Sequence, residues 1–244
     1  MWKWFHKLGA PKSFYDISGR LLPWFAVPAL LLIGVGVVWA LLFVTEDYQQ
    51  GHSVRIMYIH VPAAILAQSG YAMMAAAGGV FLVWRIKLAD IAMQCAAPIG
   101  ASITFLALVT GAIWGKPTWG TWWVWDARLT STLVLFFLYL GVMALRAEME
   151  NRESAGRATA VLALVGVINL PIIKYSVDWW FTLHQPSSFT LAEKPAMPME
   201  MWLPLLVMVI GYYAFFFTLW MMRIRVEIIN REYRTDWVKK LVVS

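Results

Sequence analysis

The sequence predicts an all-α, polytopic membrane protein with six transmembrane helices. Of its 244 residues, 61% are apolar and only 14% are charged, which is far from the composition of a soluble domain. Six apolar runs each approach the length of about 20 residues that a helix needs to cross the hydrocarbon core of a bilayer. Polar segments between the runs are short, so residues 1–244 are expected to form a single membrane domain.

The first three runs are bounded by charged or polar segments. The run 22–44 follows a polar, basic lead, and the run 61–84 begins directly after a histidine. Small residues at 75–79 allow a neighbouring helix to approach closely. The run 91–113 ends at a segment rich in tryptophan.

The last three runs have similar boundaries. The run 129–145 lies between two arginines. The run 158–175 contains Asn169 and Pro171, which predict a kink or a hydrogen bond between helices. After the run 201–222, basic and apolar residues alternate, and we expect this tail to lie along the membrane surface.

The distribution of lysine and arginine predicts the orientation in the membrane. With the amino terminus in the cytoplasm, all but five of the 20 basic residues fall in cytoplasmic segments. The five exceptions are Arg55, Lys116, Arg128, Lys174 and Lys194. This asymmetry is typical of bacterial inner-membrane proteins, and it places both termini and the tail at about 223–244 in the cytoplasm. The basic residues flank the runs without forming a continuous stripe, so the net charge of +6 requires no nucleic-acid partner.

Three loops then face the periplasm, at about 45–60, 114–128 and 176–200. The second contains five tryptophans within twelve residues: Trp114, Trp119, Trp122, Trp123 and Trp125. Tryptophans beside spans are normally membrane anchors, which is how we interpret the others in the chain. The density here, next to Asp126 and Arg128, instead predicts a platform for a flat ligand. Gly115, Pro117 and Gly120 predict a turn followed by a short interfacial helix.

Histidines in the periplasmic loops point to haem as that ligand. His60 and His184 could supply two axial imidazoles, whereas His52 lies among polar neighbours and is interpreted as a surface residue. The residues alone leave a similar surface role open for His60 and His184. Basic side chains suit the two propionates of haem, and the candidates are Arg55, Lys116 and Arg128. We expect Asp126 to orient an arginine, accept a tryptophan N–H or anchor the loop backbone.

The segment 119–126, Trp-Gly-Thr-Trp-Trp-Val-Trp-Asp, resembles the tryptophan-rich (WWD) signature of the membrane proteins that handle haem in c-type cytochrome maturation. The length, the six spans and the flanking histidines resemble the small members of this family. The resemblance implies that His60 and His184 are the axial ligands of the haem iron. It also implies an aromatic platform made by Trp114, Trp119, Trp122, Trp123, Trp125 and Asp126.

The same resemblance implies a function and partners. A b-type haem, bound without covalent attachment and in transit, is held at the periplasmic face of the inner membrane and passed to a membrane-tethered periplasmic haem chaperone. The implied complex is an ABC-type haem exporter with an ATP-binding subunit, a second membrane subunit and a small single-span subunit. The chain itself would be a non-ATPase subunit and not an enzyme, although it would promote covalent attachment of haem to the chaperone.

Three other functions are compatible with such a chain. A b-type haem subunit for electron transfer is expected to bury its histidine pairs within facing helices, and here both histidines lie at the outer boundary. A translocator that carries haem through its own spans needs polar groups along the path, and the spans offer few. An adaptor rich in aromatic residues would bind a partner without haem.

Overall fold

The structure, a computed structural model, describes residues 9–184 and 197–243, and this part of the chain is helical with no regular strand. Six helical segments in it are long and apolar enough to cross a membrane, which confirms the predicted architecture. Residues 185–196 of the loop that we predicted to be the third periplasmic one, with Lys194, lie outside the described part, as do residues 1–8 and Ser244.

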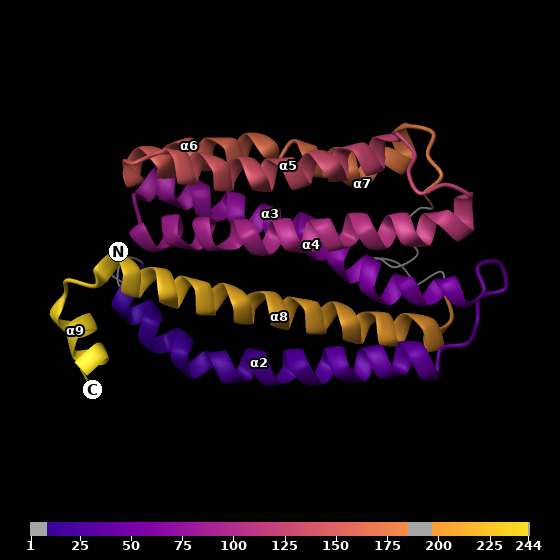
Figure 1. Ribbon diagram of the computed structural model, residues 1–244, viewed down its shortest axis with the longest axis horizontal. Helices are drawn as coiled ribbons and strands as arrows, with labels where there is room; N and C mark the ends of the chain where they lie inside the picture. The colour runs from indigo at the N-terminus through magenta and orange to yellow at the C-terminus, as the bar shows by residue number, and fades with distance from the viewer. Residues whose placement is uncertain (1–8, 185–196, 244) are drawn as a thin grey trace.

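The helices are α2 (Pro11–Leu42), α3 (Met57–Trp84), α4 (Lys87–Trp119), α5 (Ala127–Glu148), α6 (Arg152–Gly166), α7 (Asn169–Trp179), α8 (Met199–Glu232) and α9 (Asp236–Val243). A short 3₁₀ helix, η1 (His52–Ile56), leads directly into α3. The long helices run side by side along one axis (Figure 1). The start of α2 and the end of α8 lie at the same end of this bundle, as expected if both termini are on one side of the membrane.

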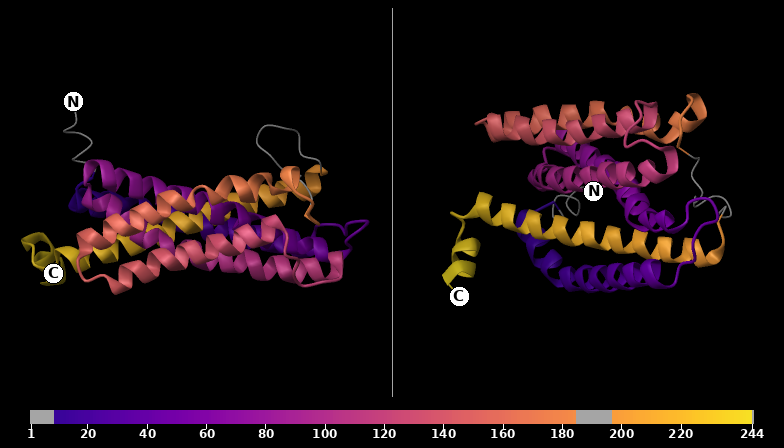
Figure 2. Two further views of the ribbon diagram at one scale, coloured as in Figure 1. Left: turned by 90° about the horizontal axis from the view of Figure 1, so that it is seen from above. Right: turned by 45° about the vertical axis from the view of Figure 1, so that its right-hand side comes forward.

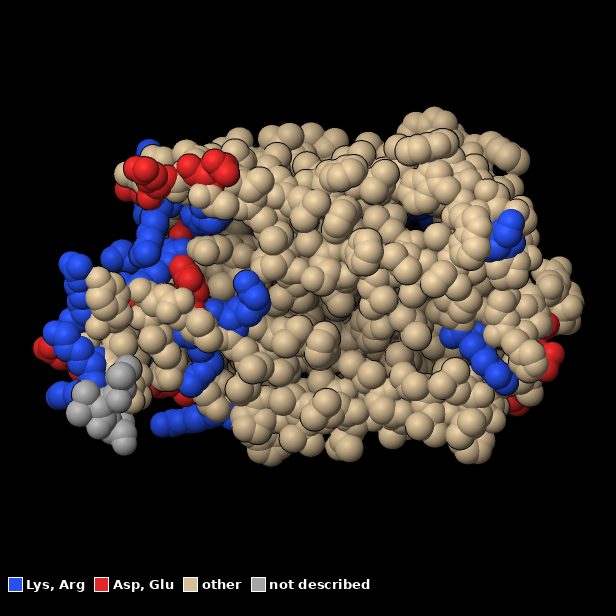
Figure 3. Space-filling view, viewed as in Figure 1, with Lys and Arg blue, Asp and Glu red and all other residues tan. Residues whose placement is uncertain are grey.

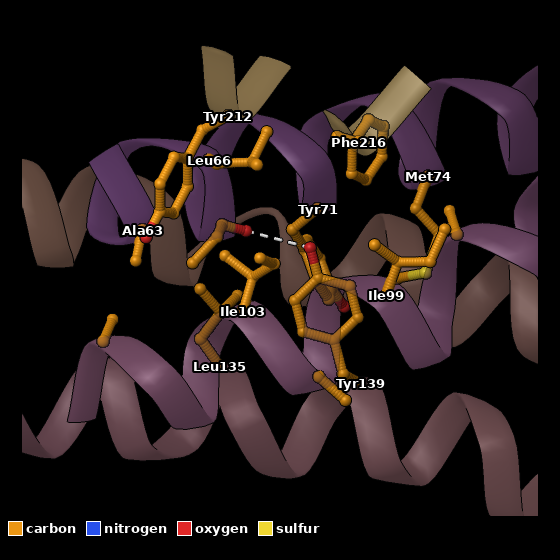
Figure 4. Close-up of a cluster of buried hydrophobic side chains, with 14 of the residues drawn as sticks. Ala63, Leu66, Tyr71, Met74, Ile99, Ile103, Leu135, Tyr139, Tyr212 and Phe216 are labelled. Carbon is orange, nitrogen blue, oxygen red and sulfur yellow. Dashed lines mark hydrogen bonds between the residues drawn. The ribbon is translucent and has the colours of Figure 1, made fainter. Parts of the chain in front are cut away.

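Helices α3 and α4 form the centre of the bundle. Helix α2 packs mainly on α8, and this pair lies on one side of α3 and α4, whereas α5, α6 and α7 lie on the other (Figure 2). In the core, the rings of Tyr71 and Tyr139 meet edge to face with centroids 5.0 Å apart. The Tyr139 hydroxyl donates a hydrogen bond to the carbonyl of Ala67 at 2.9 Å (Figure 4). Gly100 leaves room for this ring, since a side chain there would overlap it.

The fifth span is broken, as predicted. Helix α6 ends at Gly166 and α7 begins at Asn169. The Asn169 side-chain amide donates a hydrogen bond to the carbonyl of Ser131 on α5 at 2.8 Å. The break and the bond between helices thus occur together, which fixes the second half of this span against α5.

The prediction for the tryptophan segment was wrong in its local structure. Helix α4 continues through Gly115 and Pro117 to Trp119, and no interfacial helix follows within the segment. Gly115 is tolerated because the ring of Trp119 covers it, so close that an added Cβ would lie 2.9 Å from Cε3. Pro117 lies within the last turn of the helix, where it removes one backbone hydrogen bond without ending the helix before Trp119. The helix ends at Gly120, whose φ of +78° favours glycine.

The structure of the tail after residue 222 also differs in part from the prediction that it lies along the membrane surface. Its first residues extend α8 as far as Glu232, and only the short amphipathic helix α9 turns away from the bundle axis (Figure 1). Most of the visible lysine and arginine side chains gather at this end, which we call the basic end (Figure 3). There the buried Asp90 of α4 forms ion pairs with Arg146 of α5 and, at 2.6 Å, with Arg231 of α8. This cluster fastens three helices together.

Candidate functional site

The predicted site residues lie at the opposite end of the bundle, where α4 ends and α5 begins. His60 is in the first turn of α3 and is partly buried against α4. Its Nδ1 atom lies 3.0 Å from the carbonyl oxygen of Ala107 and 3.2 Å from Oγ1 of Thr110. The ring of Trp114, one turn further along α4, meets the His60 ring edge to face at 5.7 Å between centroids.

His184 lies at the same helix end, although it comes from the segment after α7. Its ring meets that of Trp119, the last residue of α4, with centroids 4.7 Å apart. Trp114 and Trp119 belong to the last turns of α4, so this helix end contacts both histidines. The structure therefore brings the two predicted iron ligands to one place, although 124 positions separate them in the sequence.

Asp126 holds His184 and the start of α5 together. Its Oδ1 atom accepts a hydrogen bond of 2.7 Å from the Leu129 backbone N–H, which caps the helix. Its Oδ2 atom accepts the hydroxyl proton of Thr182, and that hydroxyl in turn accepts the His184 backbone N–H at 3.1 Å. The carboxylate therefore anchors backbone, which was one of the three roles predicted for it.

The His184 imidazole is neutral at neutral pH. Burial and, to a smaller extent, the nearby charge of Arg128 lower its pKa to about 4, although the Asp126 carboxylate opposes both effects. Its Nδ1 atom is 3.7 Å from Oδ2 of Asp126, which is too far for a hydrogen bond. A neutral imidazole is the form that binds iron.

The remaining tryptophans follow the helix end, and within the described residues their rings meet neither His60 nor His184. Trp123 meets Trp125 edge to face at 5.5 Å, and the side chains of Trp122 and Trp125 are largely exposed, at 57% and 75% of their surface. The indole Nε1 of Trp123, by contrast, is buried. Of the five tryptophans, the structure thus places Trp114 and Trp119 nearest the histidine pair.

The three predicted propionate partners have different surroundings. Arg128 turns toward α7, where it donates hydrogen bonds to Ser176 Oγ at 3.2 Å and to the Lys174 carbonyl at 3.1 Å. Lys116 caps its own helix by donating to the Gly120 carbonyl at 3.0 Å. Arg55 donates to the Val44 carbonyl at 3.4 Å through one terminal nitrogen. His52 is exposed and pairs with Glu46 at 2.7 Å, as expected of a surface residue.

Unpartnered donors concentrate around this site. In the part of the chain that the structure describes, four buried side-chain nitrogen or oxygen atoms have no hydrogen-bond partner. Three of them belong to predicted site residues: Nε of Arg55, Nε1 of Trp123 and Nδ1 of His184. A buried polar group without a partner is costly, and such groups mark places where a ligand can complete the bonding. The N–H donors of Arg55 and Trp123, together with two imidazoles, are the kinds of groups that suit the carboxylates and the iron of haem.

Three residues that the sequence did not single out also belong to the site. Gln50 accepts the indole N–H of Trp114 at 2.8 Å, and thereby ties the loop between α2 and η1 to α4. Thr110 and Thr182 each contact a histidine as described above. Their roles depend on which residues of separate segments meet, and no local motif signals that.

Comparison with known proteins supports a common origin over the whole chain. Residues 4–239 match the family model described as heme exporter protein C. A protein of that name from Haemophilus influenzae is 51% identical over 99% of this chain and 98% of its own length. The proteins of that name from Escherichia coli K12 and Paracoccus denitrificans are 50% and 42% identical, over 100% and 91% of this chain and 98% and 92% of their own lengths.

Proposed function

The chain belongs to the heme exporter protein C family, and on that premise we propose that it binds haem at the periplasmic face of the bacterial inner membrane and delivers it to a haem chaperone. The observation that supports this most is the meeting of His60 and His184 at the end of α4, where they contact Trp114 and Trp119. Both termini and the basic end would then face the cytoplasm.

In this proposal the two histidines provide the axial ligands of a b-type haem that is bound without covalent attachment. Nδ1 of His184 faces Asp126, so Nε2 is the nitrogen available to the iron. Trp114 and Trp119 pack edge to face against the two imidazoles. Arg55 and Trp123 offer their N–H groups to the propionates. Trp122 and Trp125, being exposed, are free to contact the haem edge or the chaperone.

We also propose that the chain acts as a non-ATPase subunit of the exporter and is not itself an enzyme. An ATP-binding subunit, a second membrane subunit and a small single-span subunit would be its partners, as the family resemblance implies. The chain's contribution is to hold haem in a fixed position, so that the chaperone can form its covalent bond. Reactivity in that step belongs to the cofactor.

An electron-transfer subunit is the main alternative. Such a subunit is expected to clamp haem between histidines on facing helices, as noted above. Here His60 is on a helix, whereas His184 lies after the end of α7 and is held through loop contacts. This arrangement favours a ligand pair that opens for release.

Haem transfer in cells tests the proposal. Cells that lack the native protein would receive His60→Ala, His184→Ala or, as a matched surface control, His52→Ala. We expect covalent haem adducts of the chaperone with the control and none with the other two variants, at equal levels of each variant in the membrane. Normal adducts with either His60→Ala or His184→Ala would contradict the proposal.

A further inference from the structure

His60 has its proton position fixed by α4. Its Nδ1 atom lies 3.0 Å from the Ala107 carbonyl oxygen, and a carbonyl can only accept a hydrogen bond. Nδ1 must therefore carry the proton. If the proton were on Nε2 instead, the lone pair of Nδ1 would face a carbonyl oxygen in a partly buried site, which is unfavourable.

Thr110 reinforces the same proton position. Its hydroxyl donates to the Leu106 carbonyl at 2.7 Å, one turn back along α4. Since the single hydroxyl proton is used there, Oγ1 meets the His60 Nδ1 at 3.2 Å as an acceptor. Two acceptors thus converge on one N–H, and Nε2 makes no hydrogen bond with any residue that the structure describes.

Gly111 provides the space in which the ring lies. A Cβ at this position would be 2.9 Å from Cε1 of His60 and 3.4 Å from Nδ1, so any side chain would push the ring away. Trp114 contacts the same ring edge to face. Ala107, Thr110, Gly111 and Trp114 follow the spacing of one helix face, so α4 presents a continuous seat for the imidazole.

We propose that Thr110 and Gly111 are positioning residues of the haem site, which fix the His60 ring in the tautomer that carries its proton on Nδ1 and leaves Nε2 for the iron. The role toward iron rests on the proposed function, whereas the tautomer is a property of the protein without haem. Histidine ligands of metals commonly donate their second N–H to a carbonyl or a carboxylate, which fixes the ring and makes it a stronger electron donor. His184 has no such hydrogen bond within the described residues. The seat therefore sets His60 apart as the preorganised ligand of the pair.

The tautomer can be tested in the haem-free, full-length protein. Nitrogen NMR on protein labelled at histidine separates protonated from unprotonated ring nitrogens, and the His60→Gln variant identifies the His60 signals. We expect a protonated Nδ1 and an unprotonated Nε2. We expect Thr110→Val to shift the Nδ1 signal toward weaker hydrogen bonding, and Thr110→Ser to restore it. A protonated Nε2 in the wild type would overturn the proposal whether or not the protein binds haem.

The effect on iron needs the haem-loaded protein. Loss of one hydrogen bond to Nδ1 makes the imidazole a weaker donor, so Thr110→Val should raise the haem reduction potential while Thr110→Ser leaves it near the wild-type value. Gly111→Ala should convert part of the six-coordinate absorption spectrum to five-coordinate. Gly79→Ala is the control, because its Cβ would make only an ordinary contact of 3.8 Å with Leu164.

The outcomes distinguish this inference from the proposed function. A wild-type protein that has the expected tautomer but binds no haem would refute the function and leave the tautomer assignment standing. Haem binding with unchanged potential in Thr110→Val and unchanged coordination in Gly111→Ala would refute the positioning roles. If Gly111→Ala fails to reach the membrane, the haem reduction potential of Thr110→Val alone tests the positioning role.

Discussion

Asp126 and His184 are connected through a bridging hydroxyl instead of a direct hydrogen bond. Nδ1 of His184 lies 3.7 Å from the Asp126 carboxylate, and Thr182 joins the two by donating to the carboxylate while accepting the His184 backbone N–H. The same carboxylate caps α5. One side chain thus couples the start of a membrane helix to the segment that carries a candidate iron ligand.

This bridge predicts that Thr182 supports the position of His184. Thr182→Val keeps the shape of the side chain but removes both hydrogen bonds. We expect weaker haem binding, by about tenfold if the two bonds together contribute about 1–2 kcal/mol. Haem titration followed by absorbance measures this, and Thr182→Ser should bind as the wild type does. Equal affinity of Thr182→Val and the wild type would contradict the bridging role.

Arg55 is predicted to contact a propionate through its unpartnered Nε. Arg55→Gln should weaken binding of haem more than it weakens binding of haem dimethyl ester, whose propionates carry no charge. Arg20→Gln, remote from the site on α2, is the matched control and should not discriminate between the two ligands. If Arg55→Gln weakens both ligands equally, Arg55 acts through the fold and not through a propionate.

Asp90 is predicted to stabilise the bundle without affecting haem coordination. Asp90→Asn leaves Arg146 and Arg231 without their shared, buried counter-charge, and breaking such a pair costs about 3 kcal/mol. Thermal unfolding in detergent should show a clearly lower midpoint. The exposed pair of Glu153 and Arg157 serves as control, since Glu153→Gln should leave the midpoint unchanged. An unchanged midpoint for Asp90→Asn would mean that the cluster does not hold α4, α5 and α8 together.

The sequence predicted the spans well because their hydrophobic length is a local property. It also predicted the break near Asn169, where proline and a polar residue interrupt an apolar run. It failed at Gly115 and Pro117, which are turn signals locally but lie within α4, where the ring of Trp119 packs on Gly115. The predicted topology also placed the loops that contain His60 and His184 on the same side of the membrane.

The contacts of individual site residues were beyond prediction for a different reason. The partners of His60 on α4 depend on how two adjacent helices are aligned along their axes, and small residues on both helices permit several alignments. Likewise, Gln50 reaches Trp114 from a loop whose path no motif specifies. The role of Asp126 as a helix cap is easier to predict from the sequence, because an Asp before an apolar run is a typical start of a helix.

The coordination of haem iron tests the central claim most directly. The protein would be purified from membranes with its haem, and absorption and electron paramagnetic resonance spectra would be compared for the wild type, His60→Ala, His184→Ala and His52→Ala. We predict a six-coordinate, bis-histidine iron in the wild type and in His52→Ala, and its loss in each of the other two variants. A wild-type protein without haem, or a bis-histidine spectrum that survives in both His60→Ala and His184→Ala, would contradict the account.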